Sequence, residues 1–241
     1  MSPALPDGVA HARAPLPRRW WWGFVPYALA SIVHVAALSV GAEAVAGPTK
    51  LILMPLLAVA VLWAGRGSTW STPFTFLFVA IALSWLGDGA GTFFPTAPEL
   101  PVMLACFGLA HLCYIWLFWR VLAIRRLPRW TPVYALWWVV MLAVLWPLLG
   151  TLTIAVALYG LVLGGTAAAA SRCHPLIVWG GAFFLTSDTV LSIQLFVPHA
   201  PAWLSPVVML TYTLGQGLIA AGVTVSARLL APGTPSTEAA R

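Results

Sequence analysis

Residues 175–197 read PLIVWGGAFFLTSDTVLSIQLFV, an apolar stretch in which the single charged side chain is Asp188. About 20 apolar residues are enough for a helix to cross the hydrocarbon core of a bilayer, which is about 30 Å thick. The stretch therefore predicts a membrane-spanning helix whose carboxyl group lies inside the bilayer.

The composition of the whole chain agrees with this interpretation. Of its 241 residues, 61% are hydrophobic and 7% are charged, whereas about a quarter of the residues of an average soluble domain are charged. An ordinary soluble fold is therefore excluded, and we expect one membrane domain. The net charge of +6 does not indicate nucleic-acid binding, because the basic residues lie between apolar runs, where they orient helices.

Similar apolar runs, separated by Gly, Pro and Arg residues, cover most of the remaining sequence. They predict an all-α polytopic membrane protein with eight transmembrane helices in residues 20–228, between disordered tails at 1–19 and 229–241. Only residues 147–150 separate the fifth run from the sixth, but one kinked segment of about 40 residues would be too long for a single crossing. The predicted helices are 20–40, 50–65, 73–90, 100–119, 130–147, 150–168, 175–197 and 203–228.

The basic residues predict the direction of these helices. With a cytoplasmic N-terminus, every basic residue except Lys50 falls on the inner side, as the positive-inside rule expects. Both termini are therefore predicted to be cytoplasmic. If the chain is bacterial, its host is the inner membrane, because helical spans belong there. The arginines on the inner side are Arg13, Arg18, Arg19, Arg66, Arg120, Arg125, Arg126, Arg129, Arg172, Arg228 and Arg241.

Two carboxyl groups lie inside predicted spans, Asp88 in the third helix and Asp188 in the seventh. An Asp at the centre of a membrane helix costs about 2.5 to 3.5 kcal/mol on insertion scales, so each is a functional candidate. Counted along the helices from Pro73 and Pro175, they lie about 22 and about 20 Å from the inner boundary, a depth that allows a shared site. Their equivalent positions also suggest two four-helix halves in parallel orientation. The alternative is a structural role, with each carboxyl satisfied by serines and backbone.

Other polar residues are candidates for binding a substrate or supporting the carboxyl groups. A lone membrane histidine is more often packed and hydrogen-bonded than a ligand, and a lysine at a helix end can either snorkel or bind an anion. No HExxH motif and no close pair of histidines on one helix occur, so no metal site is expected. The candidates are His111 and Tyr114 on one face of the fourth helix, Ser84 and Ser187 near the carboxyl groups, Lys50 opening the second helix, and Tyr212 and Gln216 one turn apart on the eighth.

At these residues the sequence resembles the YhhN family of membrane proteins, the lysoplasmalogenases. The similarity extends from about residue 49 to 220, and Leu51 is a departure, since the family usually has Pro after the Lys. The matching pieces are Thr49-Lys50, SWLGDG around Asp88, FGLAHLCYI around His111, GGAFFLTSDTVLSIQLF around Asp188, and TYTLGQGLI around Tyr212 and Gln216.

The resemblance implies eight helices and hydrolysis of the vinyl ether bond of lysoplasmalogens, which releases a fatty aldehyde and glycerophosphoethanolamine or glycerophosphocholine. Such hydrolysis needs an acid to protonate the β-carbon and an anion to stabilise the oxocarbenium ion and activate water. Of two neighbouring carboxyl groups in a low-dielectric site, one can stay protonated. We assign Asp188 as the acid and Asp88 as the base, although the reverse stays open.

The remaining candidates have subsidiary roles in this reaction. His111 with Tyr114 could position water, and Lys50 or an interfacial Arg could hold the phosphate. The partners expected are a lysophospholipid with a single apolar chain and membrane lipid; neither a cofactor nor a protein partner is required. Two other classes fit the residues: a proton-coupled transporter using the same carboxyl groups, and a structural scaffold.

Overall fold

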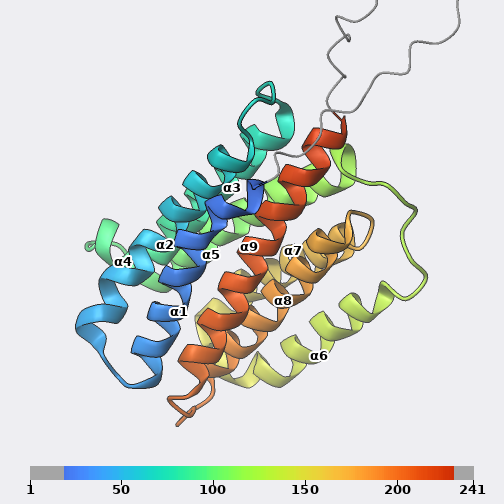
Figure 1. Cartoon of the computed structure of the whole chain (residues 1–241). Helices are drawn as coiled ribbons and strands as arrows, with labels where there is room; N and C mark the ends of the chain where they lie inside the picture. The colour runs from blue at the N-terminus through green and yellow to red at the C-terminus, as the bar shows by residue number, and fades with distance from the viewer. Residues whose placement is uncertain (1–18, 231–241) are drawn as a thin grey trace, which may run out of the picture.

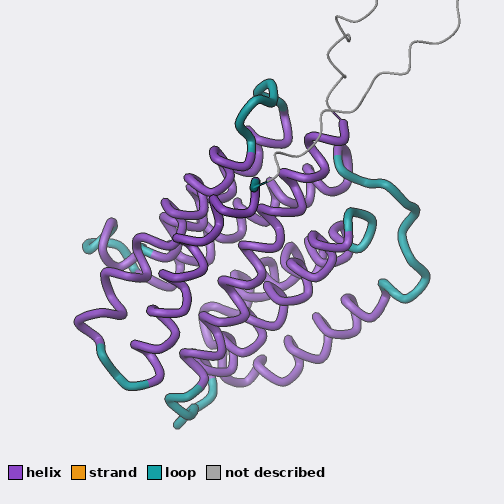
Figure 2. The backbone as a smooth tube through the Cα atoms, viewed as in Figure 1, coloured by secondary structure: helices purple, strands orange, loops and turns teal. Residues whose placement is uncertain are grey.

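The protein is an all-helical bundle in the computed structural model, which describes residues 19–230 and contains no strand in that range (Figures 1 and 2). The tails predicted at 1–19 and 229–241 fall almost entirely outside the described residues. The elements are η1 (Trp20–Phe24), α1 (Val25–Ser39), α2 (Glu43–Ala64), α3 (Thr72–Asp88), α4 (Ala90–Phe93), α5 (Glu99–Trp116), η2 (Leu117–Val121), α6 (Pro132–Leu149), η3 (Gly150–Leu152), α7 (Thr153–Ala170), α8 (Pro175–Phe196) and α9 (Leu204–Leu230).

Among the described residues, 6 helical segments are long and apolar enough to cross a membrane, which confirms the prediction of a multi-pass membrane protein. One of them, Pro132–Ala170, has 39 residues and contains both α6 and α7. These are separate helices that turn at Gly150, whose φ is 52°, and the Trp138 indole donates a hydrogen bond to the Ala157 carbonyl at 2.9 Å. The predicted division of this run into two helices is therefore correct. The apolar helix α3 is shorter, with 17 residues.

The start of the second helix was predicted wrongly. The Gly47-Pro48 pair indicated a break, but α2 begins at Glu43 and continues through Pro48. Pro48 is the sixth residue of α2, inside the helix, so the Ala44 carbonyl loses the N–H that would bond it. Membrane helices tolerate such prolines, because neighbouring groups can bond the freed backbone. The next residue, Thr49, also donates its hydroxyl to the Val45 carbonyl at 2.6 Å. Lys50 therefore lies inside α2 and does not open it.

Helices α8 and α9 pack against each other with almost no side chain between them. A Cβ atom on Gly180 would lie 2.8 Å from the Ile219 nitrogen, and one on Gly215 would lie 2.9 Å from the Phe184 nitrogen. Glycines allow this close backbone approach, which is common between membrane helices. The pair therefore forms a rigid support for the polar residues that it carries.

Helix α6 lies at the edge of the bundle (Figure 1). Its buried residues are Leu145 and Leu149, and apolar side chains such as Leu136 are exposed. An exposed apolar surface of this extent is typical of contact with lipid.

Contacts at one end bring together parts of the chain that are distant in sequence. Arg228, near the end of α9, is buried and donates to the carbonyls of Ala64 at 2.7 Å and Arg66 at 2.5 Å. At the same end, a Cβ atom on Gly23 would lie 2.8 Å from the Cβ of Trp63. The first and last described helices therefore meet the end of α2 on one side of the bundle.

Candidate active site

Asp88 and Asp188 line a single cavity of about 140 Å³. One ordered water needs about 10–15 Å³ measured in this way, so the cavity holds much more than one water. Its wall is mainly apolar and comes from α5, α6, α7, α8 and α9, with Lys50 of α2 and Asp88 of α3. The apolar lining includes Leu100, Met103, Leu104, Phe107, Met141, Leu142, Leu145, Val156, Leu163, Leu191, Leu195 and Phe196.

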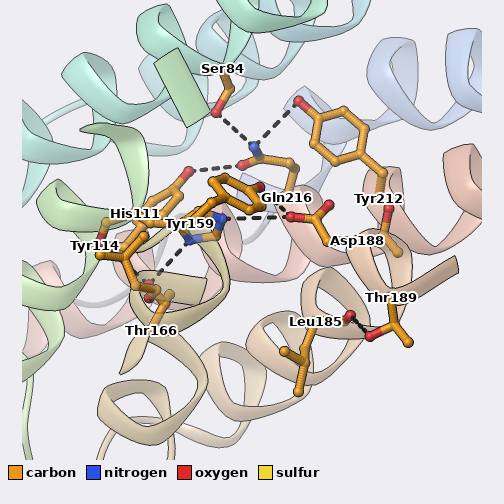
Figure 3. Close-up of polar contacts among 12 residues, drawn as sticks. Ser84, His111, Tyr114, Tyr159, Thr166, Leu185, Asp188, Thr189, Tyr212 and Gln216 are labelled. Carbon is orange, nitrogen blue, oxygen red and sulfur yellow. Dashed lines mark hydrogen bonds and ion pairs between the residues drawn. The ribbon is translucent and has the colours of Figure 1, made fainter. Parts of the chain in front are cut away.

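The Asp188 carboxyl accepts a hydrogen bond from the hydroxyl of Tyr159 on its Oδ2 atom. The Nε2 atom of His111 lies 3.9 Å from the same oxygen (Figure 3). Sequence reasoning missed Tyr159, which occurs in the apolar run of α7. The available signal was weak: a buried tyrosine hydroxyl usually has a partner, but the sequence does not identify it.

The Asp88 carboxyl is held in a separate network that reaches α5. Tyr212 donates its hydroxyl to Asp88 Oδ2 at 2.7 Å. Gln216 donates to Tyr212 at 3.5 Å and to Ser84 at 3.0 Å, and its carbonyl accepts the hydroxyl proton of Tyr114 at 2.8 Å. These hydrogen bonds fix the orientation of the Gln216 amide, and through Tyr212 they fix the carboxyl.

Four predicted candidates are therefore brought together: Ser84, Tyr114 and Tyr212 all contact Gln216 (Figure 3). Of these, Tyr212 bonds to Asp88. Among the described residues, Ser84 makes no direct hydrogen bond to a carboxyl group. Ser84 instead accepts from the Gln216 amide, because Gln216 projects from α9 toward it. The structure assigns Ser84 an indirect position.

His111 is fully buried beside Asp188, with its ring packed against Phe184 at a centroid distance of 4.7 Å. Its Nδ1 atom lies 3.1 Å from the hydroxyl of Thr166 on α7. Tyr114 lies on the same side of α5, with its ring centroid 6.3 Å from that of His111, although its hydroxyl bonds to Gln216. Sequence reasoning missed Thr166, because threonine is an ordinary residue in an apolar helix.

The last two candidates occupy different positions. Ser187 lines the cavity, but its hydroxyl donates to the Val208 carbonyl at 3.0 Å and so ties α8 to α9. Lys50 also lines the cavity and is the one cation among the lining residues. Within the described range, no carboxylate lies within ion-pair distance of it, and no cluster of three or more potential metal ligands occurs.

The geometry offers two oriented carboxyl groups and one ammonium around an apolar chamber, with the buried His111 ring beside Asp188. A sequence model of the YhhN family matches residues 45–223, which include every candidate residue from Lys50 to Gln216. No curated protein and no solved structure matches the chain.

Proposed function

This chain belongs to the YhhN family, and we propose that it is an intramembrane hydrolase that cleaves the vinyl ether bond of lysoplasmalogens. The products would be a fatty aldehyde and glycerophosphoethanolamine or glycerophosphocholine. The observation that carries this proposal is that Asp88 and Asp188 share one largely apolar cavity. A chamber of this kind suits an alkenyl chain, and paired carboxyl groups suit acid–base hydrolysis through an oxocarbenium ion.

In the proposed reaction, Asp188 is the acid and Asp88 is the base. Protonation of the vinyl ether β-carbon gives an oxocarbenium ion, which the ionised carboxylate stabilises. Water adds to this ion as Asp88 accepts a proton, and the hemiacetal collapses to aldehyde and alcohol. The ammonium group of Lys50 supports ionisation of Asp88, because both line the same cavity and opposite charges favour each other in a low dielectric.

The cavity also suggests how the substrate lies. Lys50 is the cation available to the phosphate, and the single apolar chain would extend along the leucines and methionines of α5 and α6. His111 would hold the proton or water next to Asp188, with Tyr114 supporting the network around Asp88. The reaction requires no cofactor.

We further propose that eight helices cross the membrane, namely α1, α2, α3 and α5 to α9, with both termini in the cytoplasm. The arginine distribution supports this orientation, and the contacts of Arg228 with the end of α2 support a common side for the first and last helices. In a bacterium, the host would be the inner membrane. An arrangement of two four-helix halves also fits. Asp88, at the end of α3, accepts a hydrogen bond from Tyr212 of α9, and Asp188 of α8 lies beside His111 of α5.

The test is aldehyde release from a lysoplasmalogen by the purified protein in detergent, with ethanolamine and choline headgroups in separate reactions. We expect product from the wild type and from Glu43→Gln, whose carboxyl is exposed at the start of α2. Asp88→Asn and Asp188→Asn should each lose at least about 100-fold in rate, the lower range for general acid–base catalysis. Folded wild-type protein that releases no aldehyde from either substrate would contradict the proposal.

A proton-coupled carrier is the second candidate, and one observation favours it. His111 and Asp188 lie 3.9 Å apart inside a membrane helix bundle, and such pairs form proton relays in transporters. A carrier moves its solute unchanged across a membrane, whereas the hydrolase works in detergent without a gradient. Proton-coupled uptake into proteoliposomes, combined with no aldehyde release, would establish the carrier.

A further inference from the structure

The hydroxyl of Thr166 has one proton and several neighbours that compete for it. It lies 2.9 Å from the Val162 carbonyl, one turn earlier in α7, and 3.4 Å from the His111 carbonyl. It also lies 3.1 Å from Nδ1 of His111. A carbonyl can only accept, so the shortest of these contacts uses the hydroxyl proton to bond Val162.

This donation fixes the role of the histidine nitrogen. With its proton directed at Val162, the Thr166 oxygen can only accept from the histidine, so Nδ1 must carry a proton. In a neutral imidazole one nitrogen is a donor and the other is an acceptor. The Nε2 atom of His111 is then the acceptor.

This acceptor has no hydrogen-bond partner within residues 19–230 and is completely buried. The Asp188 carboxyl is the ionisable group beside it, with Oδ2 3.9 Å away (Figure 3). A lone pair facing an ionised carboxylate would gain no hydrogen bond, whereas a protonated carboxyl can donate to it. The separation exceeds a direct hydrogen bond, but contacts between catalytic groups are often long before substrate binds.

We propose that Thr166 holds His111 with its proton on Nδ1, so that Nε2 accepts from a protonated Asp188 and the pair stores the acid proton of the site. Thr166 is then a positioning residue, which acts through His111. The titratable groups around the ring are Asp188 on α8, Tyr159 on α7 and Tyr114 on α5, with Asp88 across the cavity. The catalytic part of this inference rests on the proposed hydrolase.

The proton balance of the reaction follows from this arrangement. The Asp188 proton forms the new C–H bond at the β-carbon as the C=C π bond breaks, and a carboxylate remains opposite the oxocarbenium ion. Water forms the new C–O bond and gives a proton to Asp88. When the hemiacetal collapses, its hydroxyl proton returns to Asp188, and Asp88 gives its proton to the departing glycerol oxygen. Both carboxyl groups then regain their starting states.

The tautomer can be measured without any substrate, by ¹⁵N NMR of the full chain in detergent with ¹⁵N-labelled histidine. His111→Gln identifies the His111 signals by their loss. We expect a pyrrole-type Nδ1 and a pyridine-type Nε2 at neutral pH in the wild type and in Thr166→Ser. A pyrrole-type Nε2 in the wild type, whether in a neutral ring or in an imidazolium, would overturn the proposal.

Thr166→Val removes the hydroxyl while keeping the side-chain shape, and Thr224→Val is the matched control. Thr224 is also buried and also bonds to the carbonyl one turn earlier, Ala220 at 2.8 Å, but it has no histidine beside it. In Thr166→Val, we expect a fraction of the His111 rings to carry the proton on Nε2, seen as a pyrrole-type Nε2 signal. Thr224→Val should keep the wild-type spectrum. A wild-type spectrum in folded Thr166→Val would contradict the positioning role.

The aldehyde assay then tests the catalytic part. Residues that orient functional histidines in metal sites contribute about 10- to 100-fold, and we expect a fall of this size in kcat for Thr166→Val, with rescue in Thr166→Ser. An unchanged kcat with a changed tautomer would reject the catalytic part alone, whereas no aldehyde from the wild type would reject the hydrolase and leave the NMR result standing.

Discussion

At the scale of single residues, each carboxyl group of the cavity is held by one tyrosine hydroxyl. Tyr159 donates to Oδ2 of Asp188, and Tyr212 donates to Oδ2 of Asp88. Within residues 19–230, the Oδ1 atom of neither carboxyl group accepts a hydrogen bond. In each carboxyl, the tyrosine therefore fixes the orientation of the group through Oδ2.

Tyr159→Phe should lower kcat for aldehyde release without unfolding the protein. A hydrogen bond to a charged group contributes about 1.5 to 3 kcal/mol, so losing this one should reduce kcat by about 10- to 100-fold if it strengthens as the carboxylate forms. The measurement is the initial rate at saturating lysoplasmalogen. Tyr134→Phe is the control, because the Tyr134 hydroxyl on α6 makes no hydrogen bond within the described range. Equal rates for the two variants would show that Tyr159 only fills space.

A second prediction concerns Cys173, in the turn between α7 and α8. This side chain is fully buried, and burial raises the pKa of its thiol to about 12. Because the thiolate is the reactive form, the folded protein should contain almost none of it at about pH 8. In a variant with Cys106→Ala and Cys113→Ala, we expect maleimide labelling only after denaturation, read by mass spectrometry. Rapid labelling of the folded protein at about pH 8 would contradict the buried position.

The sequence predicts the site residues whose presence in a bilayer is costly. Asp88, Asp188, His111 and Gln216 stand out because an unsatisfied polar group in hydrocarbon is unfavourable. Tyr159 and Thr166 could not be identified in this way, because tyrosine and threonine occur in ordinary spans. Their importance depends on which helices lie side by side, and helix neighbours are decided by packing.

At the scale of elements, the length of an apolar run predicts a helix well, whereas the residue at which it begins is uncertain. The 150–168 prediction and the observed Thr153–Ala170 differ by a few residues, and the turn at Gly150 separates α6 from α7 as expected. The start of α2 was misplaced because Gly47 and Pro48 resemble a turn but occur in a helix. The short α4 was not predicted, since a four-residue helix has no periodicity to detect.

The close packing of α8 and α9 yields a prediction for Gly215. Its Cβ would lie 2.9 Å from the Phe184 nitrogen, a backbone atom that cannot move independently of its helix. Gly215→Ala should therefore separate the helices that carry Asp188 and Tyr212, and overpacking of this kind costs about 1 to 3 kcal/mol. We expect a lower melting temperature in detergent and slower hydrolysis.

Gly47→Ala is the matched control for this substitution. Gly47 also lies inside a helix, but nothing lies within 4 Å of the position that its Cβ would take. Alanine favours the helix over glycine by up to about 1 kcal/mol, so the melting temperature should stay constant or rise. A similar decrease in both variants would show that helix contact does not explain the effect at Gly215.

At the scale of the whole molecule, the cavity and the arginines within residues 19–230 lie toward opposite ends of the bundle. The lining residues include Leu100 near the start of α5, Leu145 near the end of α6, Val156 near the start of α7 and Phe196 at the end of α8. In an alternating bundle, these helix ends meet on one side, which is the outer side in the proposed orientation. A lipid substrate would therefore reach the carboxyl groups from the outer leaflet.

The proposed topology can be tested with three single cysteines placed in a chain whose native cysteines are replaced by alanine. Thr69→Cys lies between α2 and α3, Thr96→Cys between α4 and α5, and Ala202→Cys between α8 and α9, and all three positions are exposed. Four helices, α5 to α8, separate residue 96 from residue 202, so both should lie outside. A membrane-impermeant maleimide applied to intact cells should label these two and leave Thr69→Cys unlabelled until the membrane is opened. If α6 and α7 together crossed only once, three crossings would separate residues 96 and 202, and only one of them would be labelled from outside.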